Sequence, residues 1–343
     1  MTNKPLYLDI HALQSVPPSC INRDDTGSPK TARFGGVMRA RVSSQAWKKA
    51  VRDEFATMLD EKSLGQRTVH AVDLVADRIR DTAPDIAPDE AQAMAVSALK
   101  ATGINVGKQN VTGYLLFISP MQAEALAQIA IAAHASGGKI VAKEAKAILN
   151  PKERPTLNAV DIALFGRMVA DAPNLNVDAT VQVAHALGVS AAQTEYDYFT
   201  AMDDRSPEDT AGAGMIGTVE YLSATFYRYA TLDIYHLCEN LGSAAATVHA
   251  IEAFCTAFVR SMPTGKQNTF ANRTLPSAVV MQLRDTQPVS LVNAFERPVY
   301  AQGDQSLTQI ACERLVEQER FIDEAFGTKP RRTYAIVGSP YAT

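Results

Sequence analysis

The 343-residue chain has few of the features that mark metal centres, disulfide frameworks or membrane spans. Its four cysteines lie far apart and form no CxxC pair, which argues against both a zinc site and a disulfide framework. No apolar run approaches the roughly 20 residues of a membrane-spanning helix. The N-terminal segment lacks the apolar core and cleavage site of a signal peptide. We therefore expect a cytoplasmic protein with reduced thiols and no membrane partner.

The sequence also lacks the common catalytic motifs. It contains no GxSxG, no P-loop and no strand-linked GxGxxG, and its six histidines occur singly. His185 lies in the apolar run VQVAHAL, which favours a hydrogen-bonded core residue over a catalytic base. Asp24 and Asp25 could hold Mg²⁺, or could instead cap a turn and pair with nearby arginines. Because no further acidic cluster stands at metal-ligand spacing, we expect no enzyme, no metal and no cofactor.

Positive charge, in contrast, is concentrated in one short segment, residues 21–52. This segment holds eight lysines and arginines against two aspartates, a net +6, in a chain whose total is −4. A local cationic surface on an acidic protein indicates a polyanionic partner, which is usually a nucleic acid. Composition alone leaves open the alternative of a solvated basic loop and helix end.

The segment predicts a loop, a strand and a helix in succession. Residues 37–42, VMRARV, alternate as a strand does, which would put Arg39 and Arg41 on one face. The serines at 43–44 offer N-caps for a helix over about 45–58. The N-terminus of such a helix suits a phosphate group.

One face of the predicted helix carries a row of polar and basic side chains. Gln45, Lys48, Lys49 and Arg52 stand at i, i+3, i+4 and i+7 and so share that face. Like charges one turn apart repel each other unless something neutralises them. The row therefore favours an anionic ligand, although an ordinary solvated face remains an alternative.

Two later segments could also contact nucleic acid. YDYFTAM at 196–202 has aromatic side chains in a polar, glycine-flanked excursion, where they would be stacking platforms unless they attach the loop to its own domain. TGKQNTFANR at 264–273 is a polar basic loop, which is a common feature. Alanine-rich helical stretches over about 60–150 interrupt the strand-like sequence, which resumes at 158. The sequence thus predicts an α+β domain with a helical insertion and a long excursion near residue 200.

Several motifs together resemble one known family. PPSCINRDDTGSPKTARFGGVMRARVSSQAWKKAVR at 17–52 resembles the N-terminal signature of the Cascade backbone subunit of type I-E CRISPR systems, the CasC family of the RAMP superfamily. The resemblance continues, in the same order, through VDIALFGRM, AHAL, DYFTAMDD, GAGMIGTVEYLSATFYRYATLDI, GKQNTFA and PVSLVNAFERPV. Trp47 departs from it by replacing a smaller hydrophobe.

The resemblance implies a hand-shaped α+β protein of antiviral defence. It implies an RRM-like (ferredoxin-like) palm from residues 1–58 and 158–343, helical fingers from 59–157, and a thumb hairpin from 188–218 within the palm. Copies of such a subunit stack into a helical filament along one CRISPR RNA, whose bases then pair with a target DNA strand. The remaining implied partners are the large, small, 5′-handle-capping and 3′-hairpin-processing subunits of Cascade.

The resemblance also implies which residues hold the guide. The expected contacts to its sugar–phosphate backbone are Asn22, Arg23, Lys30, Arg41, Ser43, Gln45, Lys48 and Lys49, with Lys266, Gln267 and Asn268 in addition. The expected wedge at a kinked nucleotide consists of Tyr198, Phe199, Thr200 and Met202, with Met168. No RNP-type aromatic motif is present, so we do not expect the sheet to stack bases as an ordinary RRM does. The alternative is a metal-dependent endoribonuclease subunit of a type III-like effector that uses Asp24 or Asp25.

Overall fold

The computed structural model describes residues 5–201 and 215–338 of the chain. The chain divides into two compact units, which are described separately here. Unit 1 comprises residues 1–51, 183–231 and 258–343, and unit 2 comprises residues 52–182 and 232–257. None of the helices in the described ranges is both long and apolar enough to cross a membrane.

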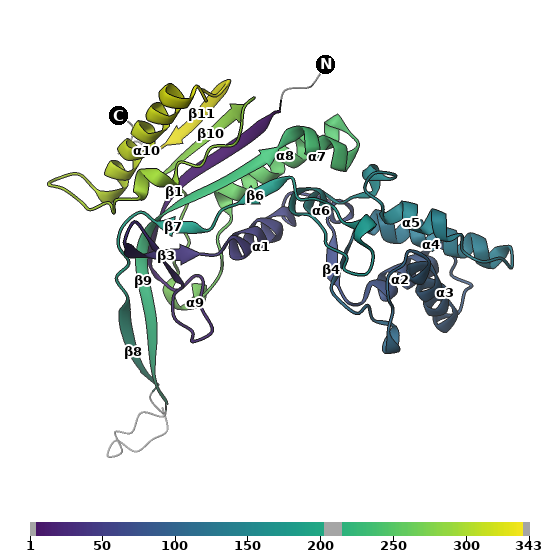
Figure 1. The fold of residues 1–343 in the computed structure, drawn as a ribbon. Helices are drawn as coiled ribbons and strands as arrows, with labels where there is room; N and C mark the ends of the chain where they lie inside the picture. Colours follow the sequence, from purple (N-terminus) through teal and green to yellow (C-terminus); the bar gives the residue numbers. More distant parts are fainter. Residues whose placement is uncertain (1–4, 202–214, 339–343) are drawn as a thin grey trace, which may run out of the picture. The chain divides into compact units, whose positions relative to one another are not determined.

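Unit 1 is built on a β-sheet with the strand order β11-β10-β1-β9-β7-β3-β2 (Figure 1). Two more strands, β6 and β8, pair with β9 outside this path. The strands are β1 Tyr7–Ser19, β2 Thr31–Phe34, β3 Val37–Val42, β6 Val181–Val183, β7 Ala186–Gly188, β8 Glu195–Ala201, β9 Met215–Asp233, β10 Ala278–Arg284 and β11 Arg332–Val337.

The order of elements is that of an RRM-like domain. Along the chain, β1 is followed by helix α1 (Ser44–Phe55), strands β6–β7 and β9, helix α8 (Ala244–Arg260) and strand β10. This is the strand-helix-strand-strand-helix-strand order of a ferredoxin-like fold, and the last strand lies beside the first, as that fold requires. The predicted α+β class with an RRM-like sheet is confirmed.

Helix α10 (Leu307–Phe326) covers part of one face of this sheet (Figure 1). Ile310 and Leu315 of the helix pack in one cluster with Leu13, Tyr227 and Ala278 of the sheet. Because side chains of α10 occupy this part of the face, bases cannot stack there as they do on an open RRM sheet.

Unit 2 is mainly helical, as the alanine-rich sequence predicts. Its core brings together Val75, Ile79, Leu99, Leu126 and Leu149 from four helices. Its helices are α2 Ala71–Thr82, α3 Pro88–Ala101, α4 Pro120–Ala135, α5 Ala142–Leu149, α6 Val160–Phe165, α7 Ile234–Leu241 and most of α8, and β4 (Gln66–Thr68) pairs with β5 (Leu116–Ile118). Residues 158–182 and 232–257, which the family resemblance places in the palm, cluster with this unit. Palm, fingers and thumb therefore remain predicted names for parts of the chain.

Candidate nucleic-acid interface

Asn22 ties the basic loop to the start of α1. Its side-chain oxygen accepts a hydrogen bond from the backbone N–H of Ser43 at 2.8 Å, and its carbonyl accepts one from the N–H of Lys30 at 2.9 Å. Ser43 is buried, and its hydroxyl accepts the N–H of Ala46 at 3.3 Å. Ser43 is therefore the N-cap, and α1 begins at Ser44, one residue earlier than predicted. Asn22 and Ser43 thus shape the helix start through acceptors that are already in use.

Three basic side chains gather at this helix start. Nδ1 of His185 lies 3.3 Å from Nη1 of Arg41 and accepts the N–H of Ser44 at 3.4 Å. Nε of Arg41 donates to the carbonyl of Thr31 at 3.2 Å. Burial, followed by the charges of Arg41 and Lys30, lowers the pKa of His185 and so favours the neutral imidazole. The hydrogen bond from the N–H of Ser44 identifies Nδ1 as its unprotonated nitrogen. The result is a cationic helix start with one neutral imidazole.

His185 corrects one interpretation of the sequence. The apolar run around it indicated a core residue, but the side chain is exposed. The reason is a break in the strand: β6 ends at Val183, β7 begins at Ala186, and His185 lies between them. The sequence did not indicate His185 as a binding residue. The one signal of its exposure is its position two residues after the end of β6.

Arg39 is fully buried and does not contribute to the cationic surface. Its burial lowers its pKa, and the guanidinium, which arginine keeps charged, is neutralised by backbone carbonyls instead of carboxylates. It donates to the carbonyls of Phe34 (3.2 Å), Gly188 (3.2 Å), Val189 (2.8 Å), Phe295 (2.9 Å) and Glu296 (3.0 Å). The strand alternation put Arg39 and Arg41 on one face, but only Arg41 of the two reaches the surface.

The predicted basic row on α1 is shorter than expected. Gln45 and Lys49 are exposed, and Lys48 is half-buried, with its pKa lowered by that burial. Arg52, at the end of the row, forms an ion pair with Asp161 at 3.1 Å. The opposite side of the helix contains Trp47, which is 1% exposed. The exposed and half-buried side chains of the row are therefore Gln45, Lys48 and Lys49.

The loop at 264–268 lies against the loop at 20–23, although more than 200 residues separate them. A Cβ on Gly265 would be 2.5 Å from the carbonyl oxygen of Ile21, so only glycine allows this approach. The approach places Lys266 and Arg23 near one thiol: burial raises the pKa of Cys20, and the charges of both cations oppose that rise. Gln267 and Asn268 follow in the short helix α9 (Gln267–Phe270).

Asp24 closes the turn of the basic loop. One of its carboxylate oxygens accepts hydrogen bonds from the N–H and hydroxyl of Thr26, at 2.9 and 2.7 Å, and from the N–H of Ser28 at 3.0 Å. These hydrogen bonds, with that from the Thr26 hydroxyl first, lower the pKa of Asp24. The turn-capping interpretation is thus confirmed for Asp24, while Asp25 is exposed beside it.

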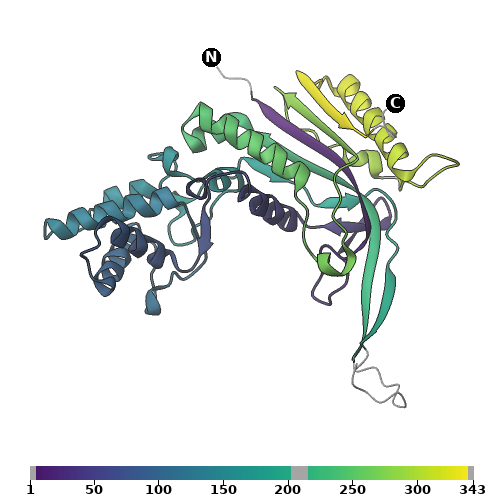
Figure 2. The same cartoon turned by 180° about the vertical axis from the view of Figure 1, so that it is seen from behind.

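Strands β8 and β9 form a long two-stranded hairpin that extends from the sheet (Figure 2). Tyr198 pairs with Thr218 and Phe199 with Gly217, so the two aromatic side chains project from opposite faces. A Cβ on Gly217 would be 2.4 Å from the ring of Phe199, which shows that this ring lies directly on the glycine. Phe199 is 38% exposed and Tyr198 is 63% exposed.

The other predicted wedge residues have different positions. Thr200 shares the hairpin face of Tyr198. Met202 lies outside the described residues. Met168 belongs to unit 2, where its side chain is 80% exposed. Within the hairpin, the structure therefore separates the predicted wedge into two faces, with Phe199 on one and Tyr198 and Thr200 on the other.

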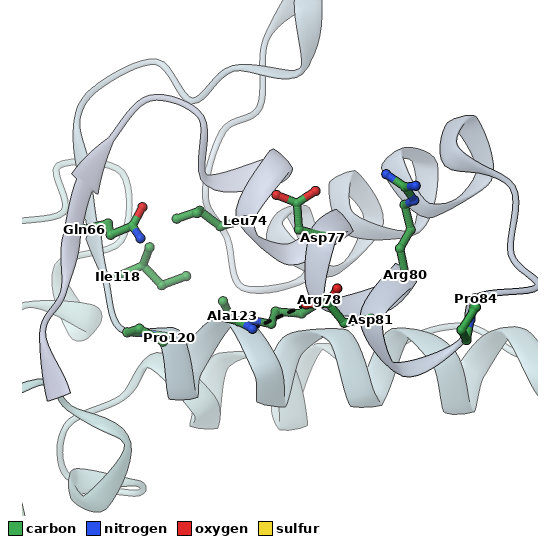
Figure 3. Close-up of a pocket in the computed structure, with 10 residues that line it drawn as sticks. All are labelled: Gln66, Leu74, Asp77, Arg78, Arg80, Asp81, Pro84, Ile118, Pro120 and Ala123. Carbon is green, nitrogen blue, oxygen red and sulfur yellow. Dashed lines mark hydrogen bonds and ion pairs between the residues drawn. The ribbon is translucent and has the colours of Figure 1, made fainter. Parts of the chain in front are cut away.

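Unit 2 also contains a cavity of about 500 Å³ (Figure 3). None of the predicted contact residues lines it. Its charged side chains are Asp77, Asp81, Arg78 and Arg80, of which Arg78 and Asp81 form an ion pair at 3.4 Å. Because these charges balance, the cavity lacks the positive excess that distinguishes the surface of unit 1.

The chain matches one protein family and chains of solved structures. Residues 8–342 match a protein family described as "CT1975-like protein". A chain of a solved structure described as "CRISPR RNA-guided surveillance complex, pre-nicking" is 34% identical, with a TM-score of 0.80, over 96% of this chain and 90% of that one. A chain of another, described as "CRISPR RNA-guided surveillance complex", is 29% identical, with a TM-score of 0.60, over 96% and 87%. A search of curated proteins finds no match.

Arg39 is buried and Lys48 is half-buried, and this difference leads to a stability prediction. Arg39→Met would remove all five guanidinium hydrogen bonds from a buried site, so we expect it to lower the free energy of unfolding of unit 1 by about 3 kcal/mol or more. Lys48→Met removes the same charge from the same segment, and we expect a change below about 1 kcal/mol. Urea titration followed by the fluorescence of Trp47, the single tryptophan and a buried residue of unit 1, measures both. Equal losses in the two variants would contradict the structural role of Arg39.

Proposed function

The chain belongs to the CT1975-like protein family, and from this premise we propose that it is the backbone subunit of a type I-E Cascade surveillance complex. In this role it binds CRISPR RNA and presents the guide for pairing with target DNA in antiviral defence. The observation that carries the proposal is the convergence of three distant segments, at 22–30, 41–49 and 264–268, on one cationic surface of unit 1. The similarity to chains of RNA-guided surveillance complexes supports it.

The chemistry of this surface suits a phosphate backbone. Arg23, Lys30 and Arg41 supply charge around the start of α1, where the helix dipole also favours an anion. Lys48 and Lys49 extend the charge along the helix. Phosphate contacts position a nucleic acid without reading its sequence, which a carrier of many different guides requires. Specificity would then come from Watson–Crick pairing between guide and target.

The hairpin supplies the second element of the proposal. Aromatic rings that project from an extended ribbon can enter between bases and hold one nucleotide out of the stack. Repeated at every copy along the filament, such a wedge would divide the guide into segments of regular length. Phe199 is the strongest candidate for this wedge, because its contact with Gly217 fixes the ring in place.

The remaining partners follow from the same proposal. Further copies of this chain would lie next to it along the RNA, and the target DNA strand would pair with the exposed guide bases. The large, small, 5′-handle-capping and 3′-hairpin-processing subunits would complete the complex in the cytoplasm. The chain itself would bind RNA without cleaving it and without a metal or cofactor.

We predict that Lys48→Ala/Lys49→Ala weakens RNA binding by a similar factor for any sequence. For single strands, log affinity falls with log salt with a slope of about −0.7 per phosphate neutralised, so losing two contacts should flatten the slope by about 1.4. Fluorescence anisotropy of labelled single-stranded RNAs of different sequence, over a series of KCl concentrations, measures both effects. Arg78→Ala/Arg80→Ala, which removes two charges from α2, is the matched control. A slope equal to that of the control would show that the α1 face is merely solvated.

We predict that Phe199→Ala disturbs the regular deformation of the bound RNA more than its affinity. The phosphate contacts carry most of the binding energy, whereas the ring acts at one nucleotide per copy. Acylation of the RNA 2′-hydroxyls in the assembled filament reports this deformation as evenly spaced reactive positions. Tyr198→Ala, on the opposite hairpin face, should preserve the spacing better. If the reactive pattern of Phe199→Ala matches the wild type, Phe199 is not the wedge.

The endoribonuclease alternative makes a distinct prediction. Asp24 uses one carboxylate oxygen to close its turn, and this structural role of the side chain favours the non-cleaving function. We therefore expect that the assembled complex leaves complementary RNA intact in the presence of Mg²⁺. Gel analysis of end-labelled target RNA measures this. Regularly spaced cuts that disappear in Asp24→Asn or Asp25→Asn would establish the alternative.

A further inference from the structure

Two guanidinium groups lie over one aromatic ring in unit 2. The Cζ atoms of Arg52 and Arg67 are 4.6 and 4.8 Å from the ring centroid of Phe117. Arg67 in β4 and Phe117 in β5 are direct partners in the antiparallel ladder, so their side chains share one face of it. Phe117 is buried, while Arg67 remains exposed. The ring thus forms a floor on which the Arg67 side chain is held.

One carboxylate, that of Asp161, lies near both arginines, and both of its oxygens are already engaged. Asp161 is buried, accepts from Nε of Arg52 at 3.1 Å with one oxygen, and accepts the N–H of Gly65 at 2.8 Å with the other. Nη2 of Arg52 also donates to the carbonyl of Gly65 at 3.4 Å. The Arg67 side chain has neither a hydrogen bond nor an ion pair with any of the described residues. This site therefore holds two positive charges against one negative charge.

The excess of positive charge at this site affects the pKa of Arg67. Burial, followed by the charge of Arg52, lowers the pKa of the Arg67 guanidinium, and the charge of Asp161 opposes the shift only in part. An anion in front of Arg67 would offset the repulsion between the two guanidinium groups. The arginine fork would offer it two parallel N–H donors, a geometry that matches a phosphate group. Contact with the ring reduces the side-chain freedom that such binding would otherwise cost.

We propose that Arg67 is an additional phosphate-binding residue of this chain, with a phosphate of RNA as its ligand. The proposal rests on the proposed function. Gly65 is part of the site as well: a Cβ there would be 2.7 Å from the Phe117 ring, so a larger residue would displace the floor.

The test is the salt dependence of RNA binding by Arg67→Gln, with a labelled single-stranded RNA as the probe. Loss of one phosphate contact should flatten the log–log slope by about 0.7 and weaken binding by about tenfold at low salt. Arg67→Lys keeps the charge but loses the fork, so its slope should equal that of the wild type while its affinity is intermediate. Arg80→Gln, an exposed arginine of the same unit without an aromatic floor, is the matched control and should change neither quantity.

Each outcome has a defined meaning. If Arg67→Gln behaves like Arg80→Gln, Arg67 contacts no phosphate and the inference is wrong, whereas the proposed function stands. If Arg67→Gln loses RNA binding only because unit 2 unfolds, its thermal transition will show it, and the slope of the folded Arg67→Lys then decides: a flattened slope would overturn the inference. If Arg67→Gln instead binds RNA normally but no longer joins other copies of the chain, the arginine serves a protein carboxylate and the inference fails. A wild-type protein that binds no RNA would overturn the proposed function, and this inference with it.

Discussion

The guanidinium of Arg39 is the interaction on which the structure of the binding surface depends. One buried side chain donates to carbonyls of the β2–β3 turn, of the end of β7 and of the segment at 295–296. A buried arginine without a carboxylate is stable only when dipoles of this kind surround it, because a lost carbonyl would leave charge and donor unpaired. These hydrogen bonds of Arg39 therefore fix β3 against its neighbours, and β3 leads directly into the N-cap of α1. Arg39 thus holds the start of α1 in position without being part of the exposed surface.

The other basic residues differ from Arg39 in what neutralises them. Arg52 has Asp161 as its counter-ion, so it contributes structure and little net charge. Arg41 and Lys30 remain at the surface beside a neutral imidazole, and Lys48 is partly desolvated. Arg67, just beyond the 21–52 segment, packs on an aromatic ring and has no ion-pair partner among the described residues. A count of lysines and arginines in 21–52 thus overestimates the charge available there and omits a cation outside it.

Local features of the fold were predictable from the sequence, and long-range pairings were not. Ser119, Pro120 and Gln122 form the capping box that their spacing predicts, because both hydrogen bonds lie within one helical turn. The helix start at Ser43 and the turn cap at Asp24 are local in the same sense. The burial of Arg39, the ion pair of Arg52 and the exposure of His185 depend on partners up to about 250 residues away. The opposite faces of Tyr198 and Phe199 follow from strand period alone, but only once the segment is known to be a strand.

The central claim is that this surface holds a guide RNA by its backbone. Purifying the protein from its own cells and sequencing the small RNA that accompanies it tests the claim most directly. The account predicts RNAs of uniform length that combine a constant repeat-derived portion with many different spacer sequences, since a backbone grip selects no sequence. Recovery of no RNA, or of fragments drawn at random from the transcriptome with no common length or repeat, would contradict it.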